Sequence, residues 1–390
     1  MHSGIWRVTT VSQPKDRPRP ATESNMTQMK LHAGLASALV LSTVAVASLL
    51  SAACAPPACA PASDPKQVAT LDGADAGTAS ADGLPLCVVV DVALPGNSSR
   101  FDYQDIDSQN GHLIVAHMGD SEVLVINLAD GAVAKRVPNI PTVRGVLAAP
   151  AVNRIFASAS ASDELVIVDA TTLEETNRVS TGAGPDGLAF DAVDHIVAVS
   201  AQHAGAVSLI AHDGDGARTD VAVGNDTGNI EFDATRGHFF VTVTGPDQLV
   251  ELTPAGDVVA RIDVGGCSGA HGLRIHPNGK SALIACENNA TAARVDLDGV
   301  DHAVVTAGTG IGPDVLSIDP GFGWLYLAAE SGDLKIFDIT GAGLKEIDSE
   351  HVGDNAHSVA VDAATHRAFF PLTNGGDGAP VLRIMAPTTK

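Results

Sequence analysis

Seven positions spaced 42 or 43 residues apart carry, with one exception, side chains that could bind an ion or a polar ligand. They are Asp102, Arg144, Asp186, Gly228, His271, Asp314 and His357. Carboxylates and imidazoles are ligands for divalent metal ions, and a guanidinium group can hold a carboxylate or a phosphate. A purely structural position could have kept one residue type in every copy. Because the residue type changes from copy to copy, we expect these positions to form a binding site.

Neighbouring positions extend this site. Asn229 could fill the gap left by Gly228, and Tyr103 follows Asp102. The predicted ligand contacts are therefore Asp102, Tyr103, Arg144, Asp186, Asn229, His271, Asp314 and His357. Loops about 15 residues further along each copy supply a second polar layer, made of His117, Gln202, His203, Glu287, Asn288, Glu330 and Asn374. Within this second layer, the candidates for holding a divalent metal ion are Glu287, Glu330, His117 and His203.

Structural roles compete with these assignments. Asp186 and Asp314 each follow a proline in a predicted turn, where an aspartate can cap the turn by accepting backbone N–H bonds. The histidines of the second layer could be plain rim residues, and its glutamates could satisfy loop amides. In five of the copies an aspartate begins the turn after the inner strand, on the opposite face, and we expect it to be structural: Asp107, Asp191, Asp233, Asp319 and Asp362.

The segments that must position these side chains form a repeat. Residues 185–191 read PDGLAFD, a turn followed by a short apolar strand and a second turn. Related segments start near each of the other six positions. A period of this length, with β-rich runs broken by Gly, Asp, Asn or Pro, is typical of a four-stranded propeller blade. The sequence thus predicts an all-β fold, a seven-bladed β-propeller of four-stranded antiparallel blades over residues 85–390.

In a propeller, the turn before each innermost strand and the loop between the second and third strands lie on the same face. Ligand sites form where such loops converge. The two polar layers should therefore meet at one mouth of the central channel.

The last repeat is one strand short. After His357 it offers three β-rich runs, while residues 86–94 (LCVVVDVAL) form a spare strand ahead of the first repeat. Pairing that strand with the last blade would close the ring and remove an exposed sheet edge. We predict that strand 86–94 pairs antiparallel with residues 381–386.

With the repeats located, the pattern resembles the YVTN-type seven-bladed β-propellers, and among them the secreted YncE-like proteins. The matching segments are PDGLAFD at 185–191, LVIVDATTLE at 165–174, LYLAAESGDLKIFD at 325–338 and NAHSVAVDAATHRAFFPL at 355–372. The literal YVTN tetrapeptide is absent. The resemblance implies a binding or surface protein. Similar propellers occur in nitrous oxide reductase and in lactonase-type hydrolases, so an enzyme stays open.

Familiar catalytic signatures are missing. The sequence contains no G-x-S-x-G, no P-loop, no dinucleotide fingerprint and no C-x-x-C. Of the five cysteines, Cys267 precedes the turn of His271, and Cys286 ends the second strand of the same blade. Both should lie near one face, and we predict a disulfide between them.

The first 84 residues indicate export. Residues 1–25 are interpreted as a non-native upstream extension, and 26–54 as a signal peptide with an apolar core at 35–50. Small residues before Cys54 resemble a lipobox, which would make Cys54 a lipidation site. Ordinary signal-peptidase cleavage is the alternative. Residues 55–84, rich in Ala, Pro, Ser, Gly and Asp, are a predicted flexible linker.

Together these features predict an exported cell-envelope protein, periplasmic, surface-anchored or secreted. It would act as a binding or scaffold protein for a small polar ligand or an envelope protein, and as a monomer. The net charge of −23 argues against nucleic acid as a partner, and membrane contact would come only through a lipid anchor. The alternative is a metal-dependent, lactonase-like hydrolase with a divalent ion at the same face. An electron-transfer accessory is a third option, without diagnostic ligand spacing.

Overall fold

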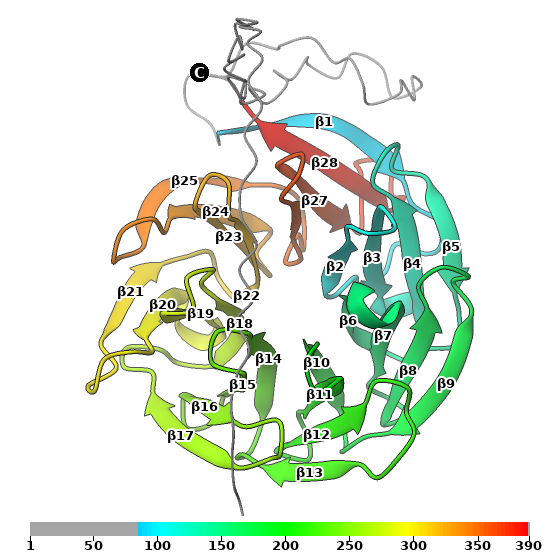
Figure 1. Cartoon of the computed structure of the whole chain (residues 1–390). Helices are drawn as coiled ribbons and strands as arrows, with labels where there is room; N and C mark the ends of the chain where they lie inside the picture. The colour runs from blue at the N-terminus through cyan, green and yellow to red at the C-terminus, as the bar shows by residue number, and fades with distance from the viewer. Residues whose placement is uncertain (1–84, 389–390) are drawn as a thin grey trace, which may run out of the picture. The chain divides into compact units, whose positions relative to one another are not determined.

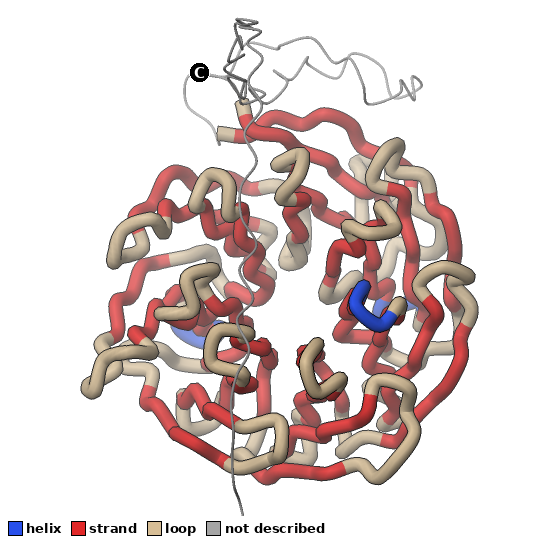
Figure 2. The backbone as a smooth tube through the Cα atoms, viewed as in Figure 1, coloured by secondary structure: helices blue, strands red, loops and turns tan. Residues whose placement is uncertain are grey.

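Seven four-stranded antiparallel sheets are arranged in a ring around a central axis (Figure 1). The computed structural model describes residues 85–388. The predicted extension, signal peptide, Cys54 lipidation site and linker lie outside the described residues. The predicted all-β, seven-bladed propeller is confirmed, and strands account for most of the described chain (Figure 2).

Each of the first four blades follows the chain from an inner strand to an outer one. Blade 1 contains β2 (Gln104–Asp107), β3 (His112–His117), β4 (Glu122–Asn127) and β5 (Val133–Val137). Blade 2 contains β6 (Val143–Ala149), β7 (Arg154–Ala159), β8 (Glu164–Asp169) and β9 (Glu175–Ser180). Blade 3 contains β10 (Pro185–Asp191), β11 (Ile196–Ala201), β12 (Ala206–Ala211) and β13 (Thr219–Ala222). Blade 4 contains β14 (Thr227–Asp233), β15 (His238–Val243), β16 (Gln248–Leu252) and β17 (Val258–Asp263).

The remaining blades keep this order, except that the last takes its outer strand from the start of the described chain. Blade 5 contains β18 (Ala270–Ile275), β19 (Ser281–Cys286), β20 (Thr291–Asp296) and β21 (Val304–Gly308). Blade 6 contains β22 (Pro313–Asp319), β23 (Trp324–Ala329), β24 (Asp333–Asp338) and β25 (Lys345–His351). Blade 7 contains β26 (Ala360–Asp362), β27 (Arg367–Leu372), β28 (Val381–Pro387) and β1 (Leu86–Ala93).

Helical structure in residues 85–388 is limited to single 3-10 turns, which are η1 (Met118–Asp120), η2 (Pro150–Val152) and η3 (Glu287–Asn289). No helix in this part of the chain has the length and apolar character needed to cross a bilayer.

The apolar core lies between blades. Among the described residues there are seven clusters of buried apolar side chains, and each joins two adjacent blades. Phe156 of β7, for example, shares a cluster with Val197 of β11. Because an inner sheet region has neighbours on both faces, the apolar residues of β8 are all buried, whereas β25 at the outside is mostly exposed. Burying each large side chain contributes roughly 1.5–3 kcal/mol, so the ring is stabilised blade against blade.

The ring closes through β1. This strand pairs antiparallel with β28, from Leu86 opposite Pro387 to Ala93 opposite Val381. The Asp91 carboxylate accepts two hydrogen bonds from the Arg383 guanidinium, at 2.9 and 2.7 Å. The predicted closure is therefore confirmed.

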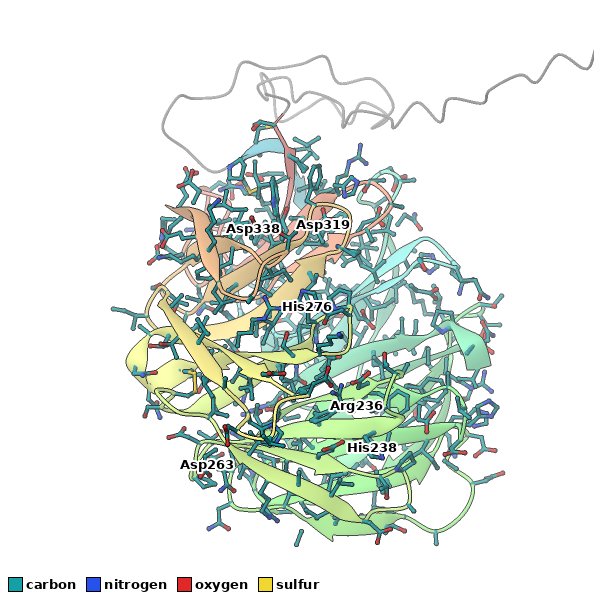
Figure 3. The ribbon with its side chains drawn as sticks, turned by 60° about the vertical axis from the view of Figure 1, so that its left-hand side comes forward. Arg236, His238, Asp263, His276, Asp319 and Asp338 are labelled. Carbon is teal, nitrogen blue, oxygen red and sulfur yellow. A yellow bond between two sulfur atoms is a disulfide. The ribbon has the colours of Figure 1, made fainter. Side chains whose placement is uncertain are left out.

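Turn residues stabilise the propeller face at which the inner strands end. Asp107, Asp191, Asp233, Asp319 and Asp362 each accept a hydrogen bond from the backbone N–H two residues later, so their predicted structural role is confirmed. Other side chains connect neighbouring blades. Arg236 of blade 4 donates to the Gly279 carbonyl of blade 5, and the His276 ring of blade 5 lies 3.1 Å from the Ile339 carbonyl oxygen (Figure 3).

Deleting residues 86–95 should lower the free energy of unfolding by an amount on the order of 5 kcal/mol, because β1 buries Leu86 and partly buries several valines against blade 7. Chemical denaturation of the deletion variant and the full chain measures this. The milder Asp91→Ala variant, which removes only the Arg383 pairing, serves as a graded comparison. Unchanged stability on deletion would show that β1 does not close the ring.

Candidate functional site

β-Bulges aim the repeated positions at the channel. In blades 2 to 6 the pairing of the inner strand with its neighbour shifts register near its first residues, so that two inner-strand residues oppose one partner residue. The first residue of each pair is one of the repeated positions: Arg144, Asp186, Gly228, His271 and Asp314. A bulge bends the strand and redirects a side chain. This local irregularity explains why these side chains, apart from the glycine, line the channel mouth.

Close contact between blades restricts the second bulge residue in blades 2, 3 and 5, but not in blades 4 and 6, where it is Asn229 and Val315. It is Gly145 in blade 2, Gly187 in blade 3 and Gly272 in blade 5. A Cβ atom on Gly145 would lie 2.2 Å from the Asp186 carbonyl oxygen, and one on Gly272 would lie 1.8 Å from the Asp314 carbonyl oxygen. Only glycine allows adjacent inner strands to approach this closely. The glycines thus hold neighbouring site residues together across the blade boundary.

A pocket of about 420 Å³ opens at the channel mouth. Its lining consists of Arg100, Asp102, Tyr103, Met118, Arg144, Asp186, Gln202, His271, Glu287, Asp314 and Glu330. Residues of the first polar layer thus meet residues of the loop layer, as expected for one propeller face. Five carboxyl groups face two guanidinium groups, so acidic groups outnumber the arginines in the pocket.

His271 stands at the centre of this charge. Its Nε2 lies 3.4 Å from an Asp186 carboxylate oxygen, and its Nδ1 lies 3.2 Å from Glu287 Oε1 and 3.5 Å from Asp314 Oδ1. Burial alone would lower the pKa of His271, but the three carboxylates outweigh burial and raise that pKa well above its usual value. Burial raises the pKa of the Glu287 carboxyl, and the neighbouring Asp314 raises it further. A protonated His271 therefore offsets part of the surrounding negative charge.

Two arginines border the pocket. Arg144 donates to the Gln202 side-chain oxygen at 2.9 Å and lies 3.6 Å from the Asp186 carboxylate. Arg100 lies 2.7 Å from Glu330 and 3.8 Å from Asp314. Sequence reasoning did not select Arg100. Its position two residues before Asp102, at the start of the same segment, was the available signal.

Asp102 and His357 lie deeper, on neighbouring blades. Both are buried, at 5% and 1% exposure. The Nδ1 of His357 lies 3.0 Å from the Asn355 carbonyl oxygen, while its Nε2 has no hydrogen-bond partner. Burial and the Asp314 and Asp186 carboxylates raise the pKa of Asp102 well above its usual value. The buried Tyr103 hydroxyl also lacks a partner.

Four predicted site residues are absent from the lining of this pocket, and one of them is the deeper His357. Asn229 lines a separate cavity on the opposite side of the channel. His117 is buried and stacks on Phe101 at 4.3 Å between ring centroids. His203 is exposed outside the pocket lining. Of the four predicted metal ligands, only Glu287 and Glu330 therefore share a cavity.

His117 lies outside the pocket, contrary to the prediction, for a local reason. The chain enters the 3-10 turn η1 directly after His117. The imidazole of His117 then lies next to the segment that leads into blade 1, and its Nε2 is 3.0 Å from the Ser99 hydroxyl. The turn-capping alternative for Asp186 is wrong, because both of its carboxylate oxygens are buried without a hydrogen-bond partner.

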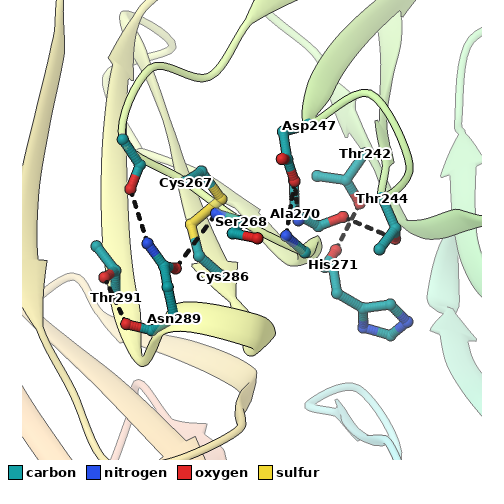
Figure 4. Close-up of a disulfide and its surroundings, with 12 residues drawn as sticks. Thr242, Thr244, Asp247, Cys267, Ser268, Ala270, His271, Cys286, Asn289 and Thr291 are labelled. Carbon is teal, nitrogen blue, oxygen red and sulfur yellow. Dashed lines mark hydrogen bonds between the residues drawn. A yellow bond between two sulfur atoms is a disulfide. The ribbon is translucent and has the colours of Figure 1, made fainter.

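A disulfide braces the segment that carries His271 (Figure 4). It joins the predicted pair, Cys267 and Cys286, with 5.3 Å between their Cα atoms. Cys286 ends β19 and Glu287 follows it directly. The Asp247 carboxylate holds the same segment by accepting hydrogen bonds from the backbone N–H groups of Gly269 and Ala270. Two contributors to the pocket, His271 and Glu287, are thus anchored to one cross-link.

Comparison with known proteins supports the fold. The family model described as SdiA-regulated matches residues 216–306. No curated protein sequence matches the chain. Hydrazine synthase of Kuenenia stuttgartiensis superposes with a TM-score of 0.63 at 13% identity, covering 72% of this chain and 94% of that one. Virginiamycin B lyase of Staphylococcus aureus superposes with a TM-score of 0.63 at 11% identity, covering 77% and 98%. A streptogramin B lyase structure gives 0.64 at 9% identity, covering 77% and 97%. At these identities the likeness extends to the propeller fold alone.

Replacing both Cys267 and Cys286 with alanine should lower the free energy of unfolding by about 3 kcal/mol, because the cross-link restricts a loop of this length in the unfolded chain. Denaturant titration of the double variant against the oxidised wild type measures the change. In hydrogen-exchange measurements, the backbone amides of residues 267–290 should exchange faster in the double variant than in the wild type. Equal stability and equal exchange in the two proteins would contradict the bracing role.

Proposed function

We propose that this protein is a binding protein that takes a small polar ligand at the channel mouth together with a divalent cation. One observation carries the proposal: seven of the thirteen buried side-chain atoms that lack a hydrogen-bond partner among the described residues lie in or next to this pocket. They are Tyr103 Oη, Arg144 Nε, both carboxylate oxygens of Asp186, His271 Nδ1, Asp314 Oδ1 and His357 Nε2. An unsatisfied buried group is unfavourable by about 1–3 kcal/mol. Ion pairs of Asp186 with His271 and Arg144, at 3.4 and 3.6 Å, offset part of this. A bound species that supplies hydrogen-bond or coordination partners would offset the rest.

The cation would bind His271, Glu287 and Asp314, and it would replace the proton that His271 carries in its absence. Their ligand atoms lie within 4.8 Å of one another, with His271 Nδ1 at 3.2 and 3.5 Å from the two carboxylates. Donors that each stand about 2.1 Å from one ion, at angles of 90–110°, lie roughly 3.0–3.4 Å apart. The set is close to that spacing. Mixed imidazole and carboxylate ligands suit zinc and manganese.

The ligand would carry an anionic group. Arg144 and Arg100 stand at the border of the pocket, partly exposed, at 26% and 36% of their side chains. Guanidinium groups bind carboxylate and phosphate in a paired geometry. An anionic group placed between these arginines and the cation would be attracted from both sides. Among proteins of similar fold, virginiamycin B lyase is described in a complex with quinupristin, so a propeller of this shape can hold a small molecule.

The cellular setting of this role is also a proposal. The apolar run at 35–50 and the small residues before Cys54 support export to the cell envelope. There the propeller would act as a rigid binding or scaffold unit. The one feature that favours the hydrolase alternative is the same cation site, because a bound ion could activate water.

Titration of the full chain with Mn²⁺ and with Zn²⁺ by calorimetry tests cation binding. We expect Glu287→Gln to weaken the first binding event at least tenfold, because it removes a charged ligand while keeping the shape of the side chain. Glu174→Gln, on an exposed turn residue of blade 2, is the matched control and should bind like the wild type. Failure of the wild type to bind either ion would overturn this part of the proposal.

A panel of lactones and esters, assayed with the metal-loaded protein, separates binding from hydrolysis. A binding protein should give no turnover above the rate of the metal ion in buffer. Turnover that disappears in Glu287→Gln and persists in Glu174→Gln would instead establish the hydrolase.

A further inference from the structure

We infer that a second cation site, formed by Asp102, Asp314 and His357, adjoins the first, and that the Asp314 carboxylate bridges the two. The channel mouth would then hold a two-ion centre. The inference rests on the proposed function, since the first ion is the one bound by His271, Glu287 and Asp314.

The geometry of the second set matches that of the first. One ligand atom from each of Asp102, Asp314 and His357 lies within 4.8 Å of the others. These residues come from the inner segments of blades 1, 6 and 7, which converge at the channel axis. All three are at least nine-tenths buried, at 5%, 4% and 1% exposure. Their positions are therefore set by the packed ring and not by mobile loops.

The hydrogen bond of His357 places its imidazole in the tautomer that can bind a metal ion through Nε2. Its Nδ1 faces the Asn355 carbonyl oxygen at 3.0 Å, and a carbonyl can only accept, so Nδ1 carries the proton. The lone pair of a neutral ring is then on Nε2, which is buried and has no partner. This arrangement, in which a backbone carbonyl fixes the tautomer and leaves the other nitrogen free, is usual for metal-binding histidines.

The acidic groups near the Nε2 lone pair of His357 favour a cation at this place. Asp102 and Asp314 are both buried, and among the described residues no arginine, lysine or histidine nitrogen forms an ion pair with Asp102 within 4.0 Å. The nearest guanidinium to Asp314 is that of Arg100, at 3.8 Å. The Nε2 lone pair of His357 receives no hydrogen bond from any described residue, and a positive ion held with Asp102 and Asp314 would supply the missing partner. A divalent cation would satisfy all three groups at once.

Asp314 connects the two sites. Its Oδ1 lies 3.5 Å from His271 Nδ1 and has no hydrogen-bond partner, and the residue belongs to both ligand sets. A carboxylate offers two oxygens, each able to hold one ion, and bridged pairs in proteins stand about 3.5–4 Å apart. Two such ions side by side bind the paired oxygens of an oxyanion. The ligand class is therefore a phosphate or a carboxylate, and a phosphate would leave further oxygens for Arg100 and Arg144.

Metal stoichiometry and electron paramagnetic resonance of the full chain loaded with Mn²⁺ test the inference. The wild type should bind two equivalents, and its spectrum should show exchange coupling between neighbouring ions. His357→Asn should retain one equivalent and lose the coupling. Asp314→Asn should bind less than one equivalent at the same Mn²⁺ concentration. His203→Asn, which changes an exposed histidine outside the pocket, should retain both ions and the coupling.

The outcomes separate this inference from the proposed function. One equivalent in the wild type, unchanged by His357→Asn and reduced by Glu287→Gln, would overturn the second site and leave the first intact. No bound Mn²⁺ in the wild type would overturn both. Because stoichiometry and coupling are read on the wild type, a variant that fails to fold does not remove the test, and Asp102→Asn provides a second substitution in the same site.

Discussion

The repulsion among buried carboxylates at the channel mouth is the constraint on which the rest of this structure depends. Asp102, Asp186 and Asp314 are almost completely buried and converge from different blades. Placing like charges together in a dry site is unfavourable unless a positive group or ligand offsets them. The apolar clusters between blades, together with closure of the ring through β1, supply the stability that holds these groups in place. A single sheet could not, because its inner edge would relax away from the charge.

Local backbone features position the side chains of the site within this stable ring. The bulges turn the repeated side chains into the channel, and Gly145 and Gly272 let adjacent inner strands approach closely enough for their neighbours to interact. The Cys267–Cys286 disulfide then fixes the segment that carries His271. Each feature limits how far His271, Glu287 and Asp314 can separate. A site fixed in this way keeps its ligand atoms at coordinating distances before any ion arrives, and so loses little entropy on binding.

The opposite end of the channel shows that burial of charge alone does not create such a site. The cavity there, of about 600 Å³, also contains charged residues. Arg274 is paired with Glu231, and Asp105 accepts backbone N–H bonds from Ile106 and Ala148 at 2.8 Å each. These groups have partners within the protein. At the channel mouth the carboxylate of Asp186 and Nε2 of His357 have no hydrogen-bond partner. The Tyr103 hydroxyl and the Gln104 side-chain oxygen, which line the second cavity, also lack one, so the two ends differ in the hydrogen bonding of their charged groups.

The sequence by itself determined the number of blades, the closing strand and the ring of repeated positions, because spacing along the chain and strand-forming runs are local properties that recur with the fold. It also indicated the Cys267–Cys286 pair, since both residues belong to one blade. Only the tertiary structure decided which side chains share the pocket. A shift of one residue reverses the face of a strand side chain; thus Asn229, one position beyond the repeated column, lines the other cavity. A 3-10 turn directs His117 away, and Arg100 reaches Glu330 from two residues outside the column. Such outcomes depend on bulges and on contacts between blades far apart in sequence, which spacing alone does not encode.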